Sequence, residues 1–263
     1  MTQENLSFSN EQGLKLAARL DTPDDRVPRG YILFGHCFTG SKDVLASARI
    51  AKALWLRGFA VFRFDFTGLG DSEGDFANTT FSSNVDDLVT AASYLRDTRD
   101  APSVLIGHSL GGAAVLAAAG QIPEARAVCT IGAPSDPEHV AHHFANHRSE
   151  IENEGEADVT IGGRSFRIKK SFLDDIESHQ LSKCVANLKK ALLIFHSPID
   201  STVGIENARH IYEAARHPKS FVTLDGADHM LTNRADAYYV AEVISAWANR
   251  YDEVGSRSEK RDA

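Results

Sequence analysis

Short apolar segments alternate with longer amphipathic stretches along most of the chain. Such alternation is typical of βαβ units that build a mainly parallel sheet. Strands with a buried or half-buried face are predicted over 31–36, 60–66, 102–108, 127–133, 191–196 and 219–225. Helices, in which apolar residues recur three or four positions apart, are predicted over 41–57, 84–98, 110–120, 203–216 and 236–250. The pattern therefore predicts an α/β fold with a doubly wound, mostly parallel sheet.

The first predicted helix illustrates how its ends and its buried face are assigned. Ser41 is the expected N-cap, because a serine side chain can accept a hydrogen bond from a free N–H of the first turn. Apolar spacing then predicts a buried face made of Val44, Ala48, Ala51 and Trp55.

Two regions depart from the βα rhythm. Residues 14–20 alternate apolar and polar side chains, which predicts an edge strand paired with 6–9 as an antiparallel hairpin. Residues 135–187 form the most polar stretch before the C-terminal tail. This stretch is predicted to hold a helix over 137–152, a hairpin over 157–169 that turns at Gly162-Gly163, and a short helix over 171–180.

These boundaries predict how the chain is divided. The α/β core is expected over 1–134 and 188–252, with a small inserted lid over 135–187. Residues 253–263 are rich in charge and are expected to form a disordered tail.

Composition narrows the function classes. The 28 Lys and Arg against 36 Asp and Glu give a net charge of −8, which argues against nucleic-acid and anionic membrane partners. The three cysteines show no CxxC spacing, so neither a disulfide framework nor a zinc site is expected. With no signal peptide and no apolar run of about 18 residues, a cytoplasmic enzyme is expected. The oligomeric state stays open.

The strongest chemical signal is the pentapeptide Gly107-His108-Ser109-Leu110-Gly111. It reads G-x-S-x-G and lies between a predicted strand and a helix of very small residues. This is the context of a nucleophile elbow, where a serine stands on a sharp turn and the flanking glycines let strand and helix pass closely. Ser109 is therefore the predicted nucleophile, against the alternative of an ordinary serine in a Gly-rich turn.

In this context the chain resembles the α/β-hydrolase superfamily, whose nucleophile, acid and histidine follow in that order along the sequence. The resemblance implies Asp200, just past the 191–196 strand, as the acid and His229, after the last strand, as the base. Asp200 has a structural alternative as a helix N-cap, and Asp225 and Asp228 are rival acids.

The same resemblance implies an oxyanion hole built from two backbone N–H groups. Leu110 supplies one of them, directly after the nucleophile. Phe38 supplies the other, because His36-Cys37-Phe38-Thr39-Gly40 is similar to the family's H-G-F-T-G loop. Cys37 departs from the family glycine, which permits backbone angles that are costly for other residues.

Two further motifs are given structural roles. Gly68, Gly70 and Gly74 have the spacing GxGxxxG with no helix opening there, which is not a dinucleotide fingerprint. The histidines of the 137–152 helix lack a third ligand at HExxH spacing, so we expect a lid helix and not a metal site. No cofactor and no metal is predicted.

Phrases such as HCFTGSKD and GHSLGGAAVLAAA make the chain similar to a bacterial hydrolase domain that is often fused to an OsmC-type domain, and its lid position resembles that of small-lid feruloyl and cinnamoyl esterases. The function implied is a serine esterase that cleaves small acyl esters through an acyl-enzyme on Ser109. A thioesterase or aminopeptidase-like amidase with the same three residues is the alternative, with Glu152, Glu154 or Asp174 as possible anchors for a substrate amine. A non-catalytic accessory module, suggested only by Cys37, is a third hypothesis.

Overall fold

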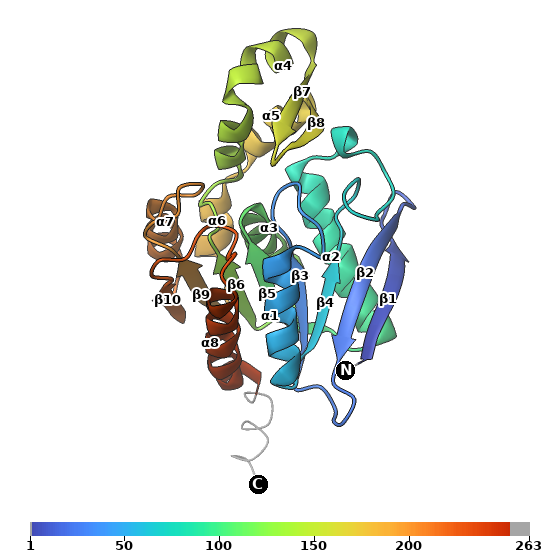
Figure 1. Ribbon diagram of the computed structural model, residues 1–263, viewed down its shortest axis with the longest axis vertical. Helices are drawn as coiled ribbons and strands as arrows, with labels where there is room; N and C mark the ends of the chain where they lie inside the picture. The colour runs from blue at the N-terminus through green and yellow to red at the C-terminus, as the bar shows by residue number, and fades with distance from the viewer. Residues whose placement is uncertain (1, 253–263) are drawn as a thin grey trace.

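The computed structural model describes residues 2–252, and over this range most strands join one eight-stranded sheet (Figure 1). Its strand order is β1-β2-β4-β3-β5-β6-β9-β10. In chain order these strands are β1 (Thr2–Ser9), β2 (Lys15–Thr22), β3 (Tyr31–Gly35), β4 (Ala60–Phe64), β5 (Pro102–His108), β6 (Ala127–Ile131), β9 (Ala191–His196) and β10 (Lys219–Thr223). The pairs β1·β2 and β2·β4 are antiparallel and all the others are parallel. The predicted mostly parallel sheet with an N-terminal antiparallel hairpin is confirmed.

The prediction that residues 14–20 form an edge strand is wrong. β2 lies between β1 and β4, and β1 occupies the edge of the sheet. Leu16, Ala18 and Leu20 are buried on one face of β2, while the residues between them are mostly more exposed. The alternation therefore reports one solvated face of an interior strand and says nothing about an unpaired edge.

Helices cover both faces of the sheet (Figure 1). α1 (Leu45–Leu56) and α8 (Arg234–Asp252) pack on one face. The other face carries α2 (Phe81–Thr98), α3 (Leu110–Ala118), α6 (Leu181–Ala186) and α7 (Glu206–Ala214), with the short 3-10 helices η1 (Phe76–Asn78) and η2 (Ala119–Gln121) nearby in the chain. Each face of the sheet packs into its own apolar cluster. In β3, Ile32 and Phe34 lie in the cluster on the α1 and α8 face, and Leu33 lies in the cluster on the other face. Adjacent side chains of the strand therefore point to opposite faces.

The start of α1 differs from the prediction. The helix begins at Leu45 with Val44 as N-cap, and Ser41 instead accepts the N–H of Val44 in a preceding turn. Its buried residues are Ala46, Ser47, Ile50, Ala51, Ala53 and Leu54. Only Ala51 of the predicted face is confirmed, since Val44, Ala48 and Trp55 are half-buried. Before α1, the Lys42 N–H donates to Asp65 and the Lys42 carbonyl accepts from Arg63, so the backbone of this residue is bonded to β4 and the loop after it.

The segment 135–187 contains more breaks than its sequence suggested. It holds the 3-10 helix η3 (Pro137–His147), α4 (Arg148–Glu154), the hairpin β7 (Glu156–Ile161) and β8 (Arg164–Lys169), α5 (Lys170–Ser178) and α6. One helix over 137–152 is a wrong prediction. Phe144 leaves helical geometry at φ −134° and ψ 25°, and its buried ring packs near Phe172. Helix α6 was not predicted.

The hairpin β7–β8 turns at Gly162 and Gly163, whose φ angles of +57° and +78° confirm the predicted turn. Figure 1 shows α4, α5, β7 and β8 gathered at one end of the molecule. The division into a core and a lid stays a prediction, and "lid" below means residues 135–187. The predicted tail 253–263 lies outside the described residues. No helix within residues 2–252 is both long and apolar enough to cross a bilayer.

Candidate active site

Ser109 is the single residue between β5 and α3. Its φ of 55° places it in the left-handed region, which is strained for a residue with a side chain. A Cβ atom on Gly111 would lie 2.5 Å from the Gly35 carbonyl oxygen, and one on Gly107 would lie 2.5 Å from the Gly111 carbonyl carbon. Only glycine fits at both positions, so α3 can approach the sheet closely while the Ser109 side chain stands clear of it.

The structure brings Ser109, His229 and Asp200 into one chain of hydrogen bonds. His229 Nε2 lies 3.0 Å from Ser109 Oγ, and His229 Nδ1 lies 2.7 Å from Asp200 Oδ2. A carboxylate only accepts hydrogen bonds, so Nδ1 carries the proton and donates it to Asp200. His229 Nε2 is then free to accept the Ser109 hydroxyl proton.

Asp200 does two things at once. Its Oδ1 accepts the N–H groups of Thr202 and Val203, each at 2.9 Å, while Oδ2 binds His229. The helix N-cap alternative is wrong, because the N–H groups bound by Oδ1 belong to a turn and the next helix begins at Glu206 with Ile205 as its N-cap. Burial alone would raise the pKa of Asp200, but the hydrogen bonds from His229 and the two N–H groups outweigh burial and hold its pKa below the usual value.

The rival acids are engaged or turned elsewhere. Asp228 accepts hydrogen bonds from the N–H and the hydroxyl of Thr232. Asp225 is exposed, and within the described residues neither carboxylate bonds to His229.

Two histidines that the sequence analysis missed support the same residues. His108 Nε2 donates to the backbone carbonyl of His229 at 2.8 Å, and His196 Nε2 donates to that of Val203 at 2.7 Å. Burial lowers the pKa of His108 to about 4, so its ring is neutral at pH 7. Each is the last residue of a parallel strand, β5 and β9, and this position at the carboxyl edge of the sheet is the signal that could have found them.

The loop after β3 fixes the direction of the Phe38 N–H. The Cys37 carbonyl accepts from His36 Nδ1 at 2.8 Å and from the Gly40 N–H at 2.9 Å. Because the Cys37 carbonyl and the Phe38 N–H belong to one planar peptide unit, holding the first orients the second. Leu110 N–H stands at the start of α3, and within residues 2–252 neither N–H donates to a protein group.

Cys37 is buried, yet it belongs to neither apolar cluster of the sheet. Burial raises the pKa of its thiol to about 11, so the thiol is protonated. Burial likewise lowers the pKa of neighbouring His36 to about 4, and an uncharged His36 does not make the thiol reactive.

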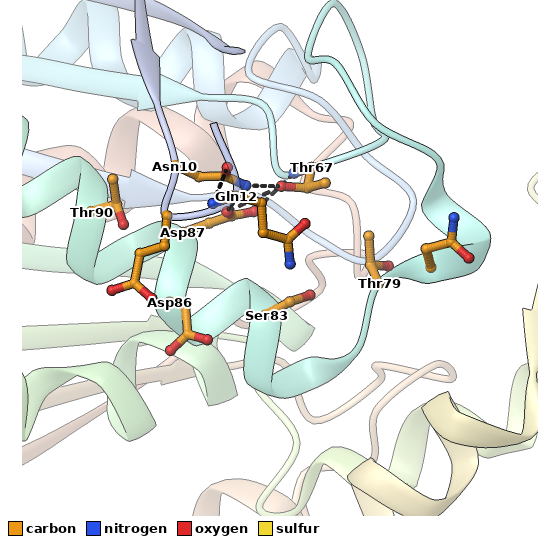
Figure 2. A pocket seen from close by; sticks show the side chains of 10 residues that line it. Asn10, Gln12, Thr67, Thr79, Ser83, Asp86, Asp87 and Thr90 are labelled. Carbon is orange, nitrogen blue, oxygen red and sulfur yellow. Dashed lines mark hydrogen bonds between the residues drawn. The ribbon is translucent and has the colours of Figure 1, made fainter. Parts of the chain in front are cut away.

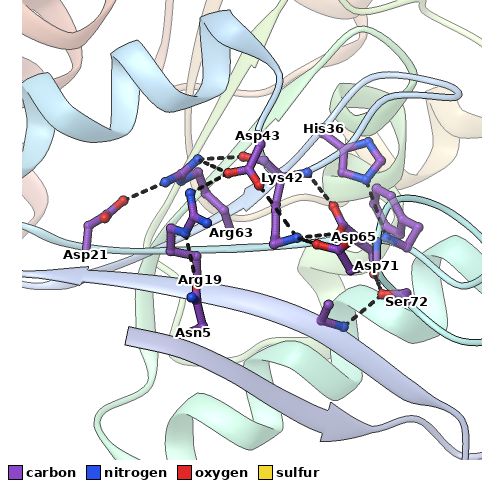
Figure 3. A network of polar contacts seen from close by, with 12 residues as sticks. Asn5, Arg19, Asp21, His36, Lys42, Asp43, Arg63, Asp65, Asp71 and Ser72 are labelled. Atoms are coloured by element: carbon purple, nitrogen blue, oxygen red, sulfur yellow. Dashed lines mark hydrogen bonds and ion pairs between the residues drawn. The ribbon is translucent and has the colours of Figure 1, made fainter. Parts of the chain in front are cut away.

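Behind this loop lies a network of ion pairs whose members, apart from Asp71, are buried (Figure 3). Lys42 Nζ binds Asp65 Oδ2 at 2.7 Å and Asp71 Oδ2 at 2.6 Å, while Asp65 Oδ1 accepts the Lys42 N–H. Arg63 donates to the Lys42 carbonyl and to Asp21 Oδ2, the latter at 2.8 Å. Lys42 and Asp65 are buried, and a buried charge is stable only when paired in this way. The network anchors the segment that follows Phe38.

The glycine-rich loop after β4 has the structural role expected of it. Ser72 Oγ donates to the Asp65 carbonyl at 2.6 Å and accepts the Ala17 N–H at 2.9 Å, which ties the loop to β2. Gly70 has φ +55°, and a side chain there would collide with the Asp65 carboxylate.

A cavity of about 540 Å³ opens beside Ser109 and His229. Its lining from the core includes Cys37, Phe38, Thr39, Thr202 and Met230, and from the lid His143, Ile161, Gly162 and Arg164. An ester carbonyl can therefore reach the serine between the Phe38 loop and the lid.

A second cavity is small and polar and lies away from Ser109 (Figure 2). Asn10 Nδ2 there donates to Thr67 Oγ1 at 3.1 Å and to Asp87 Oδ1 at 3.4 Å. These polar groups bond to one another and hold the β1–β2 turn against α2. We therefore assign the cavity a structural role.

The lid histidines do not converge on one point, although the rings of His139 and His142 meet edge to face with their centres 4.8 Å apart. His139 Nε2 donates to the Thr202 carbonyl at 3.0 Å, His143 lines the large cavity, and His147 contacts Glu150. No group of three or more His, Cys, Asp or Glu side chains suited to a metal occurs within residues 2–252. The absence of a metal cofactor stays a prediction.

Comparison with known proteins gives the family. A family profile described as "Serine aminopeptidase, S33" matches residues 27–154. The esterase domain of a Rhodothermus marinus protein is 49% identical, with a TM-score of 0.78 over 96% of this chain and 100% of that one. Est1E of Butyrivibrio proteoclasticus with bound ferulic acid, 21% identical, has a TM-score of 0.79 over 94% of this chain and 98% of that one, and shows the fold alone.

Sequence relatives include the palmitoyl-protein thioesterase ABHD10, mitochondrial. The mouse protein is 28% identical over 69% of this chain and 62% of its own length, and the human protein is 26% identical over 82% of this chain and 69% of its own length. The matched region thus spans less than two thirds of the mouse relative. The prediction of an enzyme of the hydrolase class is confirmed by these relatives and by the profile. With a relative 49% identical over its whole length, the chain belongs to the α/β-hydrolase superfamily.

Proposed function

We propose that the chain is a serine hydrolase that cleaves carboxylic esters of small acyl substrates through an acyl-enzyme on Ser109. The observation that carries the proposal is the hydrogen-bonded chain from Asp200 through His229 to Ser109, at the edge of the large cavity. A free hydroxyl is a poor nucleophile at neutral pH, and this arrangement supplies the base that it needs.

In the first half-reaction, Ser109 Oγ attacks the ester carbonyl carbon while His229 Nε2 takes the hydroxyl proton. The N–H groups of Phe38 and Leu110 donate to the oxyanion that forms. The bond to the alkoxide oxygen then breaks, His229 returns the proton to that oxygen, and the alcohol leaves with the acyl group still on Ser109.

In the second half-reaction, water replaces the alcohol. His229 takes a proton from the water as its oxygen attacks the acyl carbon, and then gives that proton to Ser109 Oγ as the acid is released. Asp200 stays ionised throughout and stabilises the imidazolium, which agrees with its lowered pKa.

A thioesterase is the second candidate, supported by the printed name of the ABHD10 relatives. The same acyl-enzyme forms whether oxygen or sulfur leaves. An aminopeptidase-like amidase is less well supported, because Glu152 pairs with Arg148, Asp174 pairs with Lys170, and no acidic side chain is among the described cavity lining. The accessory-module hypothesis weakens because the Cys37 backbone, not its side chain, orients the Phe38 N–H.

The test of the nucleophile is hydrolysis of p-nitrophenyl acetate. Ser109→Ala and His229→Ala should each lower kcat by roughly 10³–10⁶, and the double variant should be little worse, because the two act as a unit. Ser178→Ala, which changes an exposed serine at the end of α5, is the matched control and should keep normal turnover. A serine-directed phosphonate should abolish wild-type activity. Additive losses in the double variant would refute the assignment.

The test of the leaving group is a matched set of ester, thioester and aminoacyl arylamide with one acyl chain. We expect the highest kcat/KM for the ester. A thioester preferred tenfold or more would replace the esterase proposal with the thioesterase. Prolonged EDTA treatment should leave activity unchanged, and loss restored by zinc would contradict the cofactor-free mechanism.

A cytoplasmic location is also proposed. It is supported by the free, exposed thiol of Cys184, since exposed thiols persist in reducing compartments. Fractionation of cells that express the tagged protein tests it.

A further inference from the structure

Arg164 brings a permanent charge to the cavity beside Ser109. It is the first residue of β8, directly after the Gly162-Gly163 turn, and it lines the same cavity as Ser109 and His229. Among the described lining residues it is the only Lys or Arg, and no Asp or Glu accompanies it. In a chain of net charge −8, the cavity therefore carries a local positive charge.

The contacts of Arg164 leave part of its guanidinium free. Nη2 donates to the carbonyl of Thr39, the residue after Phe38. The guanidinium carbon lies 5.0 Å from the centre of the Phe166 ring. These contacts hold the side chain in place without neutralising it. Within residues 2–252, Arg164 has no carboxylate partner.

The other lid arginines differ in this respect. Arg148 pairs with Glu152 and Glu177, and Arg167 pairs with Asp158 at 3.0 Å. Arg164 is thus the lid arginine within the described residues that keeps its charge unpaired, and it is the one that lines the cavity.

We infer that Arg164 is a specificity residue that binds a carboxylate carried by the substrate, so that the natural substrates are anionic esters. This inference rests on the proposed esterase function. A guanidinium stays charged at every working pH and its planar N–H groups match a carboxylate. A positive charge here also repels the free amine of an aminopeptidase substrate.

The experiment compares three chromogenic esters of the same acyl length. Each of the two anionic esters differs from the neutral one by a single carboxylate. They are neutral 4-nitrophenyl hexanoate, 4-nitrophenyl hemiadipate with a carboxylate on the acyl chain, and 3-carboxy-4-nitrophenyl hexanoate with a carboxylate on the leaving group. The measured quantity is kcat/KM for each anionic ester divided by that for the neutral ester. Any effect of the lost Thr39 hydrogen bond acts on all three substrates and cancels in this ratio.

Arg164→Gln should lower the ratio by about 10- to 100-fold for at least one anionic ester, the range of a charge-assisted hydrogen bond. The affected ester shows whether the carboxylate belongs to the acyl or the alcohol side. Arg164→Lys should restore part of the ratio. Arg167→Gln removes the same charge from the same strand outside the cavity, and should leave the ratio within twofold.

Unchanged ratios in Arg164→Gln, with Ser109-dependent hydrolysis of the neutral ester intact, would overturn this inference and leave the esterase proposal standing. An equal loss in Arg167→Gln would also overturn it, because the effect would then be long-range. If Arg164→Gln does not fold, the wild-type ratio is measured against ionic strength, where it should fall as salt rises, and a flat ratio overturns the inference. If the wild type hydrolyses no ester, the esterase proposal fails first.

Discussion

Gly111→Ala tests the close approach on which the Ser109 turn depends. In an ordinary helix this change stabilises by about 1 kcal/mol, because alanine is the better helix former. Here the added methyl carbon would lie 2.5 Å from the Gly35 carbonyl oxygen and closer still to that of His36, whereas ordinary contact begins at 3.4 Å. Both obstacles are backbone atoms at the end of β3 and cannot rotate away.

The start of α3 must therefore move away from β3 by about 1 Å, since packed interiors hold no spare room for a methyl group. Overpacking costs about 1–3 kcal/mol, and the helix preference of alanine offsets about 1 kcal/mol of this. We expect a net loss of about 1 kcal/mol and at most about 2 kcal/mol. For a chain of this size, a loss of about 1 kcal/mol lowers Tm by roughly 2–4 °C. The Leu110 N–H moves with the helix, so kcat should fall by about 10²–10³, the effect of one lost oxyanion donor.

The assay measures Tm and the kcat for p-nitrophenyl acetate on the same preparations, with active sites titrated by a phosphonate. Gly120→Ala is the matched control, because no atom lies within 4 Å of a Cβ there, and it should keep the wild-type Tm or gain slightly. A Gly111→Ala variant with wild-type Tm and kcat would refute the argument from close approach. A loss of Tm with normal turnover would refute its link to the Leu110 donor.

Three further predictions concern single side chains. Asp200→Asn should lower kcat more than Asp228→Asn, because only Asp200 bonds to His229, and the reverse order would identify a different acid. Cys37→Gly should keep kcat within about tenfold, whereas Cys37→Leu crowds the peptide that orients Phe38 and should lose far more kcat than stability; a lower Tm with normal kcat would show that Cys37 only fills volume. Burial lowers the pKa of His108 to about 4, so the unfolded chain binds more protons between pH 4 and 6.5, and the free energy of unfolding should fall by up to ~3 kcal/mol as the pH drops across this range. Urea unfolding of His108→Gln should show a shallower pH dependence, and equal slopes would contradict this.

The sequence by itself determined the features whose partners lie a few residues apart. The turn at Ser109 follows from glycines two positions before and after it, and the hairpin turn follows from Gly162-Gly163. The parallel sheet was predictable for a similar reason, because strands buried on both faces have continuous apolar runs. Sequence reasoning failed at Ser41, which was predicted to cap the first helix but closes the turn before it, while the next residue is bonded to Asp65 from a distant loop.

Only the tertiary structure decided which distant residues meet. Asp200 and His229 are 29 residues apart, and His229 and Ser109 are 120 apart, so their contacts depend on strand order and loop path. Local sequence could not separate Asp200 from Asp228, since both can close a turn; only the fold turns one of them toward the imidazole. The contact of Arg164 with Thr39 spans 125 residues and had no sequence signal at all. Such contacts are decided by packing of the whole chain, because each one requires several elements to be placed before the two side chains come within reach of each other.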